Sequence, residues 1–304
     1  MRFMNSSRFI WRRKLFLAGL LVLLCAGLLV CWRMGRQWEQ NSAAAPASPF
    51  PGTTEEYEQK FPHLLINHLD MQTDSPEAKA VDLNAAGNSL VITEAGDYRL
   101  TGTMRGRVTV RTEDGNVHLM LDGVNISSPE GPAVYVESAG KAVLTAMPGT
   151  ENVLSDSGSY AADAPYEACV YSACDLTVNG TGSLTVNGYY KDAIRSRDVV
   201  KILDTHLTVK CKRTGIHGTD GIHVAGGRVM ISSEKNGFKT TKNAKNGKGV
   251  MMFSGGEHSV VAGQYAFVCL RNDLYVFNCT IRAKSVVATY DVGGQKIIQE
   301  GCVR

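Results

Sequence analysis

A short segment past the middle of the chain combines aromatic rings with charges of both signs. Tyr189 and Tyr190 precede Lys191 and Asp192, and Arg195 follows three residues later. Aromatic rings can stack on the apolar faces of sugars, and Lys or Arg side chains can pair with the carboxylates of acidic sugars. The alternative is that the tyrosines cover an edge of the core while the charges form a solvated turn.

Positive charge is concentrated around the same segment. Residues 191–248 contain 13 Lys and Arg residues against 5 Asp and Glu residues, although the whole chain has a net charge of only +3. A local surplus of this kind can attract a polyanion, so Arg213 and Lys239 join the candidate ligand-binding residues. The alternatives are a solubilising surface or attraction to anionic lipid headgroups. The small net charge gives no support to nucleic-acid binding.

The elements that must position these residues are short strands. From about Val81 onward, runs such as RVTV, AVYV and SLTVNG alternate with Gly, Asn and Asp. Strands this short, at close and even spacing, predict an all-β protein. The 31 glycines agree with a fold that has many tight turns.

The strands repeat with a period of about 22 residues. One apolar column reads Val170, Ile194, Ile216, Phe238 and Phe267, and each member follows a small residue. Stacked repeats place like residues above like, and so they bury a core that no single repeat could bury alone. Three short strands and three turns fit this length. We therefore predict a right-handed parallel β-helix over residues 81–304; a β-sandwich is the alternative, but it would not explain the columns.

Polar residues mark the turns of each repeat. Asn and Asp tolerate a left-handed backbone and bond their own turns. The turns between the last two strands of each repeat lie at residues 178–180, 203–205, 225–227, 254–256 and 277–279. A second polar column is formed by Asp175, Asp198, Asp220, Asn243 and Asn272.

Several motifs together resemble a bacterial carbohydrate-binding domain family. They are LDGVNI, GPAVYV, GTENVLSD and LTVNGTGSLTVNGYYKD, and the resemblance covers roughly Leu83 to Ala283. The known member is a clostridial surface protein with a pectate-lyase-like right-handed β-helix that binds cellulose and polygalacturonate and carries calcium. The resemblance therefore implies polysaccharide binding at a cell surface, and it leaves catalysis open because this fold also hosts non-enzymes.

The resemblance also implies calcium, but this chain departs from the family pattern. In the family an Asp-Gly-Ile step stacks carboxylates on successive repeats. Here that column reads Asp192, Thr214, Asn236 and Tyr265, with a single charge left. Calcium takes about six to eight oxygen ligands. We therefore expect at most a weaker or displaced calcium site, and its candidate ligands are Asp175, Asp192, Asp198 and Asp220.

The first 80 residues are organised differently. Residues 15–32 form an uncharged apolar run of 18 residues, close to the length that spans a bilayer as a helix. Basic residues gather before this run, which places the N-terminus in the cytoplasm. We predict a cytoplasmic tail (1–14), one transmembrane helix (15–32), a linker or stalk (33–80) and an extracellular domain. The alternative is a cleaved signal peptide.

Six cysteines fall in the predicted extracellular domain. They are Cys169, Cys174, Cys211, Cys269, Cys279 and Cys302. An even number permits disulfides. Because their spacing does not repeat, we favour small side chains that fill a narrow core.

These observations predict a membrane-anchored, extracellular, non-catalytic carbohydrate-binding protein. Its expected ligand is cellulose, polygalacturonate or another wall glycan. A polysaccharide lyase is the first alternative; such an enzyme needs a base and cations, and the only candidate cluster is Arg195 with Asp192 and Asp198. A structural or adhesion solenoid that binds a protein partner is the second alternative. The candidate ligand-binding residues are Tyr189, Tyr190, Lys191, Asp192, Arg195, Arg213 and Lys239.

Overall fold

The computed structural model describes residues 54–243 and 246–304. The predicted cytoplasmic tail and the predicted membrane span at residues 15–32 lie outside this part of the chain. Within it, no helix is long and apolar enough to cross a membrane.

The described residues form an all-β structure whose strands all pair in parallel, in two sheets. This confirms the predicted all-β class. The 9-stranded sheet contains β2 (Ser89–Ile92), β4 (Arg107–Arg111), β6 (Val134–Ser138), β9 (Ala168–Ser172), β12 (Asp192–Ser196), β15 (Thr214–Gly218), β18 (Asn236–Thr240), β21 (Tyr265–Cys269) and β24 (Ala288–Val292).

The second sheet has 16 strands and two arms that meet at β5 (Asn116–Ser127). Residues 116–121 of this long strand pair with β7, and residues 125–127 pair with β8. In the same sheet, β3 (Gly96–Met104) pairs with β5, and β1 (Lys79–Asp82) pairs with β3. The first arm contains β7 (Lys141–Ala146), β10 (Leu176–Asn179), β13 (Val199–Ile202), β16 (Gly221–Val224), β19 (Val250–Phe253), β22 (Leu274–Val276) and β25 (Lys296–Ile298). The second arm contains β8 (Glu151–Ser155), β11 (Ser183–Gly188), β14 (His206–Cys211), β17 (Arg228–Ser233), β20 (Glu257–Ala262) and β23 (Thr280–Ser285).

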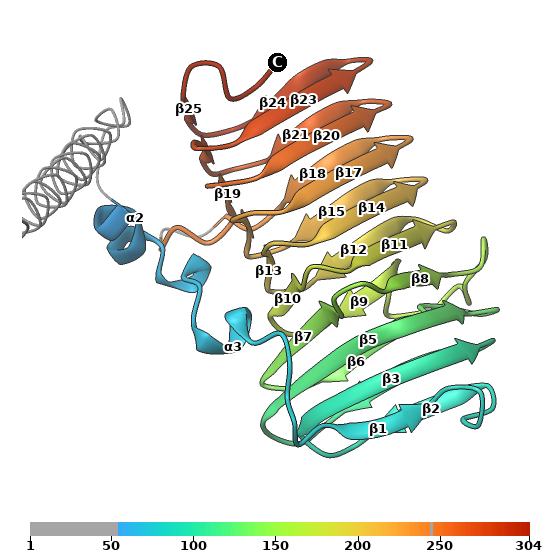
Figure 1. Ribbon diagram of the computed structural model, residues 1–304. Coiled ribbons are helices and arrows are strands. Elements are labelled where there is room, and N and C mark those ends of the chain that lie inside the picture. The colour runs from blue at the N-terminus through green and yellow to red at the C-terminus, as the bar shows by residue number, and fades with distance from the viewer. Residues whose placement is uncertain (1–53, 244–245) are drawn as a thin grey trace, which may run out of the picture. The chain divides into compact units, whose positions relative to one another are not determined.

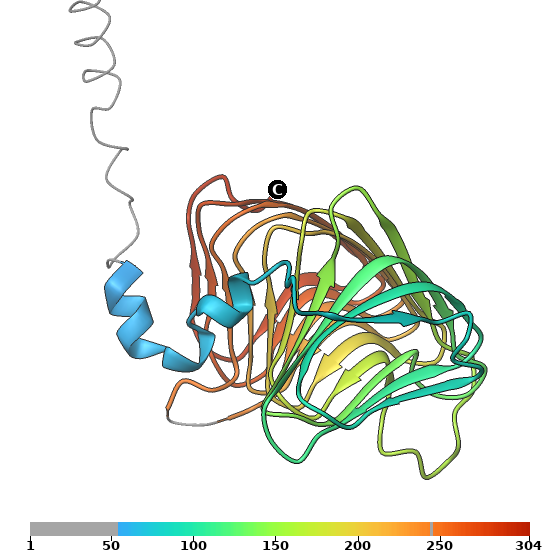
Figure 2. The same ribbon diagram turned by 60° about the horizontal axis from the view of Figure 1, so that its bottom comes forward.

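Successive repeats stack on one another. From β6 to β23, each repeat contributes one strand to the 9-stranded sheet, one to the first arm and one to the second arm, as β12, β13 and β14 do. Figure 1 shows the stack rising from β1 and β2 to β23 and β24, and Figure 2 looks more nearly along it. This arrangement fits the predicted solenoid.

The apolar column predicted from the repeat is confirmed. Strand register pairs Val170 with Ile194, Ile194 with Ile216, Ile216 with Phe238 and Phe238 with Phe267. All five side chains are buried. The rings of Phe238 and Phe267 stack with centroids 5.9 Å apart. The column therefore runs through the core from one repeat to the next.

The corner between the two arms has a left-handed backbone in successive repeats. Asp204 has a φ of 40° and Asn278 a φ of 53°. In the other repeats glycine takes this conformation, at Gly180, Gly227 and Gly256. Only residues that tolerate positive φ fit here, which confirms the predicted role of these turn residues.

The cysteines serve as core residues. All six in the described part of the chain are buried, and none of them is in a disulfide. All six belong to the continuous hydrophobic cluster of the stack. The interpretation of these cysteines as small core-filling side chains is confirmed.

Residues 54–78 lie across the outward face of the first arm (Figures 1 and 2), and we call them the covering segment. They belong to the predicted linker or stalk at residues 33–80. The segment contains α2 (Thr54–Lys60), the 3-10 helix η1 (Pro62–Leu64) and α3 (His68–Met71). Beneath it a ladder of outward side chains is buried: Thr177, Lys201, His223, Met252 and Tyr275.

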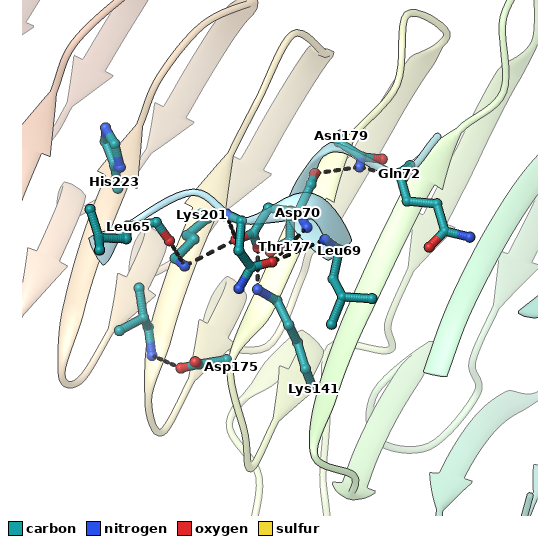
Figure 3. A network of polar contacts seen from close by, with 12 residues as sticks. Leu65, Leu69, Asp70, Gln72, Lys141, Asp175, Thr177, Asn179, Lys201 and His223 are labelled. Carbon is teal, nitrogen blue, oxygen red and sulfur yellow. Dashed lines mark hydrogen bonds and ion pairs between the residues drawn. The ribbon is translucent and has the colours of Figure 1, made fainter. Parts of the chain in front are cut away.

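Asp70 is the centre of the contact between the covering segment and the sheet (Figure 3). Its carboxylate is fully buried and accepts hydrogen bonds from Lys141 and Thr177, while Lys201 Nζ lies 3.1 Å away. Asn67 caps α3 and donates its backbone N–H to the same carboxylate, at 2.9 Å. Burial would raise the pKa of Asp70, but the hydrogen bonds from Lys141 and Thr177 outweigh it and lower the pKa.

Candidate functional site

One ladder of side chains runs along the outward face of the 9-stranded sheet. Each member stands one residue after a member of the inward apolar column, so it points to the other face. The ladder is aromatic at one end and cationic in the middle. In order, from β4 to β24, strand register aligns Thr109, Tyr135, Tyr171, Arg195, His217, Lys239, Val268 and Asp291. We call this row the outer ladder.

The aromatic end is completed by a loop between β8 and β9, residues 156–167, which we call the tyrosine loop. Its Tyr166 ring lies edge-on to Tyr135, with centroids 5.0 Å apart, and also contacts Tyr171. Tyr160 stacks on Tyr190 at 4.2 Å. Tyr135, Tyr166 and Tyr190 are half-buried. Part of each of these three rings therefore remains accessible to a ligand.

Asp156 holds the tyrosine loop in place. Its carboxylate is buried and accepts a hydrogen bond from the Tyr160 hydroxyl at 2.7 Å and from the backbone N–H of Tyr189 at 2.5 Å. Burial raises the pKa of Asp156 to about 6, although these hydrogen bonds work in the opposite direction. The side chain of Tyr189 itself is 51% exposed.

Glu167, at the end of the tyrosine loop, gathers three cations. Its carboxylate lies 2.6 Å from Lys191, 2.8 Å from Arg195 and 2.7 Å from Arg213. Burial would raise the pKa of Glu167, but hydrogen bonds from Arg213 and Lys191 lower it to about 2. The cationic part of the site is thus organised around one acid that remains ionised.

Asp192 forms the buried floor of the same cluster. It accepts bonds from Arg213 Nε at 2.7 Å, Arg213 Nη2 at 2.9 Å and the backbone N–H of Thr214 at 3.1 Å. His217 Nδ1 lies 3.4 Å from it. Burial would raise the pKa of Asp192, but His217 and Arg213 lower it to about 2. The carboxylate is therefore committed to Arg213 and is shielded from solvent.

Lys239 is the cation of the outer ladder that stands most free of acids. It is half-buried, and no carboxylate in the described residues pairs with it. Burial, opposed by Asp192 and reinforced by Arg213 and Arg195, lowers its pKa. Its ladder neighbour His217 is buried, and this burial lowers the histidine pKa. Four cations, Lys191, Arg195, Arg213 and Lys239, thus face two carboxylates at this site.

The structure brings six of the seven predicted ligand-binding residues to one face. Tyr190 lies at the tyrosine loop, and Lys191, Asp192, Arg195, Arg213 and Lys239 form or border the charged cluster. Tyr189 contributes its backbone to Asp156 and projects its ring into solvent.

The four predicted calcium ligands do not meet at one point. Asp192 is held by Arg213. Asp175, Asp198 and Asp220 lie elsewhere, in the turns that connect the 9-stranded sheet to the first arm. There Asp220 is paired with Lys248 at 2.6 Å and Lys242 at 3.5 Å. Among the residues that the structure describes, no group of three or more His, Cys, Asp or Glu is arranged to hold a metal ion. Two lysines therefore balance the negative charge of Asp220, a role that a metal ion would have at a calcium site.

The basic residues of 191–248 do not form one stripe. Lys210 projects from the second arm, Lys201 is buried under the covering segment, and Lys242 and Lys248 bind Asp220. Arg195 and Lys239 lie on the outer ladder, and Lys191 and Arg213 bind Glu167 beside it. The positive charge is therefore divided among several faces.

Sequence reasoning missed Tyr135, Tyr166, Tyr171 and Glu167. Tyr171 could have been found by reading the repeat one position further, because the column after Val170 continues as Arg195, His217 and Lys239. Tyr166 and Glu167 lie in a loop that has no counterpart in the other repeats, so the repeat carries no signal for them.

Comparisons with known proteins agree with a carbohydrate-related surface. A family model described as carbohydrate-binding domain-containing protein matches residues 86–296. A carbohydrate-binding domain-containing protein of Acetivibrio thermocellus is 34% identical over 144 residues, which cover 45% of this chain and 50% of that protein. The chain thus spans about half the length of this relative.

A solved structure is similar over most of the described chain. It is a gadolinium derivative of the polysaccharide lyase-like protein from C. thermocellum, with a TM-score of 0.70 and 28% sequence identity. The match covers 74% of this chain and 97% of that one.

Proposed function

The chain belongs to the family of carbohydrate-binding domain-containing proteins, and from this premise we propose that it binds a polysaccharide along the outer ladder without cleaving it. The observation that carries the proposal is the register of the ladder, which aligns Tyr135 and Tyr171 with Arg195, His217 and Lys239 on one face. Neighbouring strands are about 4.8 Å apart, so these five rungs form a row roughly 20 Å long. Tyr135, Arg195 and Lys239 are half-buried and accessible to a chain of sugar rings, whereas Tyr171 and His217 are buried.

The two halves of the ladder suit two properties of a sugar chain. Tyrosine rings present a flat apolar face with a polar tip, which suits a sugar ring. The cations suit a carboxylate, because Arg and Lys are the residues that pair with such groups. The cluster holds two more cations than carboxylates, so we propose that an acidic polysaccharide such as polygalacturonate binds more tightly than neutral cellulose.

Retention on immobilised polysaccharide tests this proposal. We expect the protein to bind a polygalacturonate matrix and to be released as salt rises, because salt screens partly exposed charges. Lys239→Ala should weaken binding by about 1 kcal/mol, or roughly fivefold. Lys210→Ala removes an exposed lysine from another face and is the matched control. Absence of binding to polygalacturonate, cellulose and wall glycans, or equal losses in the two variants, would refute the proposal.

A polysaccharide lyase is a second candidate because of Lys239. This lysine is half-buried, and burial, opposed by Asp192 and reinforced by Arg213 and Arg195, lowers its pKa, which suits a general base. Lys239 would take the proton next to a uronate carboxylate, the electron pair would form a carbon–carbon double bond, and the glycosidic C–O bond would break. The proton would then return to the leaving oxygen. Absorbance of the unsaturated uronate product distinguishes this activity from binding alone; a flat trace would exclude it for the uronan tested.

The remaining sequence predictions stay proposals. They are the membrane anchor at residues 15–32, the extracellular location, the domain boundaries and the right-handed course of the pectate-lyase-like solenoid. The one-residue offset between inward and outward columns agrees with the solenoid. Fractionation of cells that express the full chain tests the anchor: the protein should remain with membranes through a high-salt wash, and recovery in the soluble fraction would contradict it.

A further inference from the structure

The last repeat is closed by a segment that follows β25. Residues 302–304 run beside β23 and form an isolated parallel bridge between Ile281 and Val303. Three backbone hydrogen bonds hold them: Ile281 N–H to Cys302 O at 2.7 Å, Arg304 N–H to Ile281 O at 2.9 Å, and Ala283 N–H to Arg304 O at 2.9 Å. We call residues 299–304 the closing segment. It meets β23 at one end of the strand order of the described sheet.

Two cysteines lie together where the closing segment meets the core. Cys279 precedes β23 and is 8% exposed, and Cys302 is 6% exposed. Both belong to the same hydrophobic cluster. The side chain of Gln299 bridges the two segments. Its Oε1 accepts a hydrogen bond from the backbone N–H of Asn278, the residue before Cys279, at 2.8 Å and another from the Cys302 thiol at 3.8 Å. Backbone pairing of Ile281 with Val303 places the two cysteines on adjacent parallel segments.

Cys279 and Cys302 are neighbours in the core, and their side chains interact. Burial first, and then Cys302, raises the pKa of Cys279 to about 12. Two of the other cysteines contact different groups: Cys174 contacts Ser172, and Cys269 contacts Thr240 and the carbonyl of Gly249. A disulfide needs Cα atoms on neighbouring segments, and the pairing of Ile281 with Val303 provides such segments here.

We propose that Cys279 and Cys302 are a disulfide site that fastens the closing segment to the last repeat under oxidising conditions. The oxidant is a small-molecule disulfide such as oxidised glutathione. The Cys302 thiolate attacks it, and one glutathione thiol leaves; the Cys279 thiolate then attacks the mixed disulfide, and the second thiol leaves. Two electrons pass to the oxidant, and the two cysteine protons end on the released thiols. Cys302 reacts first because residues 302–304 pair with β23 through three backbone hydrogen bonds and can open locally.

The bond would stabilise one end of the stack. A disulfide restricts the unfolded chain, by an amount that grows with the logarithm of the length of the loop it closes, and this loop is about one repeat long. The closing segment shields the end of a core whose inner columns are otherwise covered only by the next repeat. Fastening it should therefore slow opening of the last repeat first.

Peptide mapping of the full chain, kept in a mixture of reduced and oxidised glutathione, tests the proposal. We expect one linked peptide pair, containing Cys279 and Cys302 and lighter by two hydrogens than the separate peptides. Oxidation should raise the unfolding midpoint by several degrees and slow amide exchange at Ile281 and Ala283. In Cys302→Ser both effects should vanish, and in the control Cys211→Ser both should remain.

Other outcomes would overturn it. These are a persistently reduced Cys279–Cys302 pair in oxidised glutathione, linkage of either residue to one of the other four cysteines, or a midpoint shift that survives in Cys302→Ser. Because mapping reads the bond directly, a variant that folds poorly does not affect this result: the wild-type chain alone decides whether the linkage forms.

Discussion

At the residue scale, the site depends on a buried charge that only one arginine fully compensates. Asp192 has no exposed side-chain surface, and Arg213 gives it two hydrogen bonds. Removing one partner of a buried ion pair leaves the other charge without compensation, and this costs more than the pair contributes when intact. Arg213 thus holds Asp192 in position between β12 and β15. Under the proposed function it also offers positive charge to a ligand.

Arg213→Ala should therefore destabilise the fold by about 3–5 kcal/mol. Lys191→Ala is the matched control, because its ion pair with Glu167 is about one-third exposed on both sides and should cost at most about 1 kcal/mol. Denaturant unfolding of both variants measures the difference. Equal and small losses would show that Asp192 tolerates burial without its arginine.

The candidate residues could be predicted from the sequence only in part. Lys191, Asp192, Arg195, Arg213 and Lys239 were visible because charge and repeat position marked them. Their partners were hidden, since Glu167 reaches Arg213 across 46 positions of sequence through a loop without a repeat signal. The burial of Asp192 was also hidden, because a carboxylate in a repeat column looks the same whether a cation or a calcium ion neutralises it.

At the scale of elements, the tyrosine loop is fastened by a carboxylate whose pKa is raised. Asp156 has a pKa of about 6 in the folded protein, against about 3.9 for an unperturbed Asp. A raised pKa means that its contribution to stability is complete below the unfolded value and is lost as pH rises through about 6. The loop should therefore be held more firmly in mild acid than at neutral pH.

Amide exchange in residues 157–167 should become faster between pH 5 and pH 7, beyond the intrinsic rate change, on the order of tenfold. Asp156→Asn keeps an oxygen that can accept from the Tyr160 hydroxyl but does not titrate. In this variant the excess pH dependence should disappear. An unchanged pH profile in Asp156→Asn would show that another group controls the loop.

The covering segment depends on Asp70, whose pKa is lowered by its partners. Asp70→Ala would leave Lys141 and Lys201 buried without their carboxylate, and we expect a loss of about 3–5 kcal/mol together with release of residues 54–78 from the first arm. Limited proteolysis within this segment measures the release. The control is Asp74→Ala, whose pair with Arg99 is largely exposed and should cost less than about 1 kcal/mol. Equal protection of the two variants would contradict this role of Asp70.

The contacts of the covering segment were beyond sequence prediction for a physical reason. A repeat signal arises where stacking forces like residues into register. The covering segment is a single element, and its Asp70 meets lysines from two different repeats. The same holds for the pocket between the covering segment and the sheet. It has a volume of about 190 Å³ and an apolar lining that includes Leu64, Ile66 and Met252. The covering segment packs on the sheet once in the chain, so no repeat marks this pocket.

At the scale of the whole molecule, the stack follows closely from the sequence. The inner column from Val170 to Phe267 keeps its register across five strands, because one misplaced repeat would expose the core of both neighbours. The outer ladder shares this register but not its constraint, since an outward position accepts tyrosine, arginine, histidine or lysine. The scaffold is therefore predictable from the repeat, whereas the residues of the outer ladder are not.

The central claim is that this outward row binds the sugar chain, and amide exchange with and without an oligogalacturonate tests it most directly. We expect slower exchange in β9, β12, β15 and β18 and in the tyrosine loop when the ligand is added, with a smaller effect in Lys239→Ala. Protection confined to the second arm or the covering segment, or no protection at ligand concentrations that saturate binding, would contradict it.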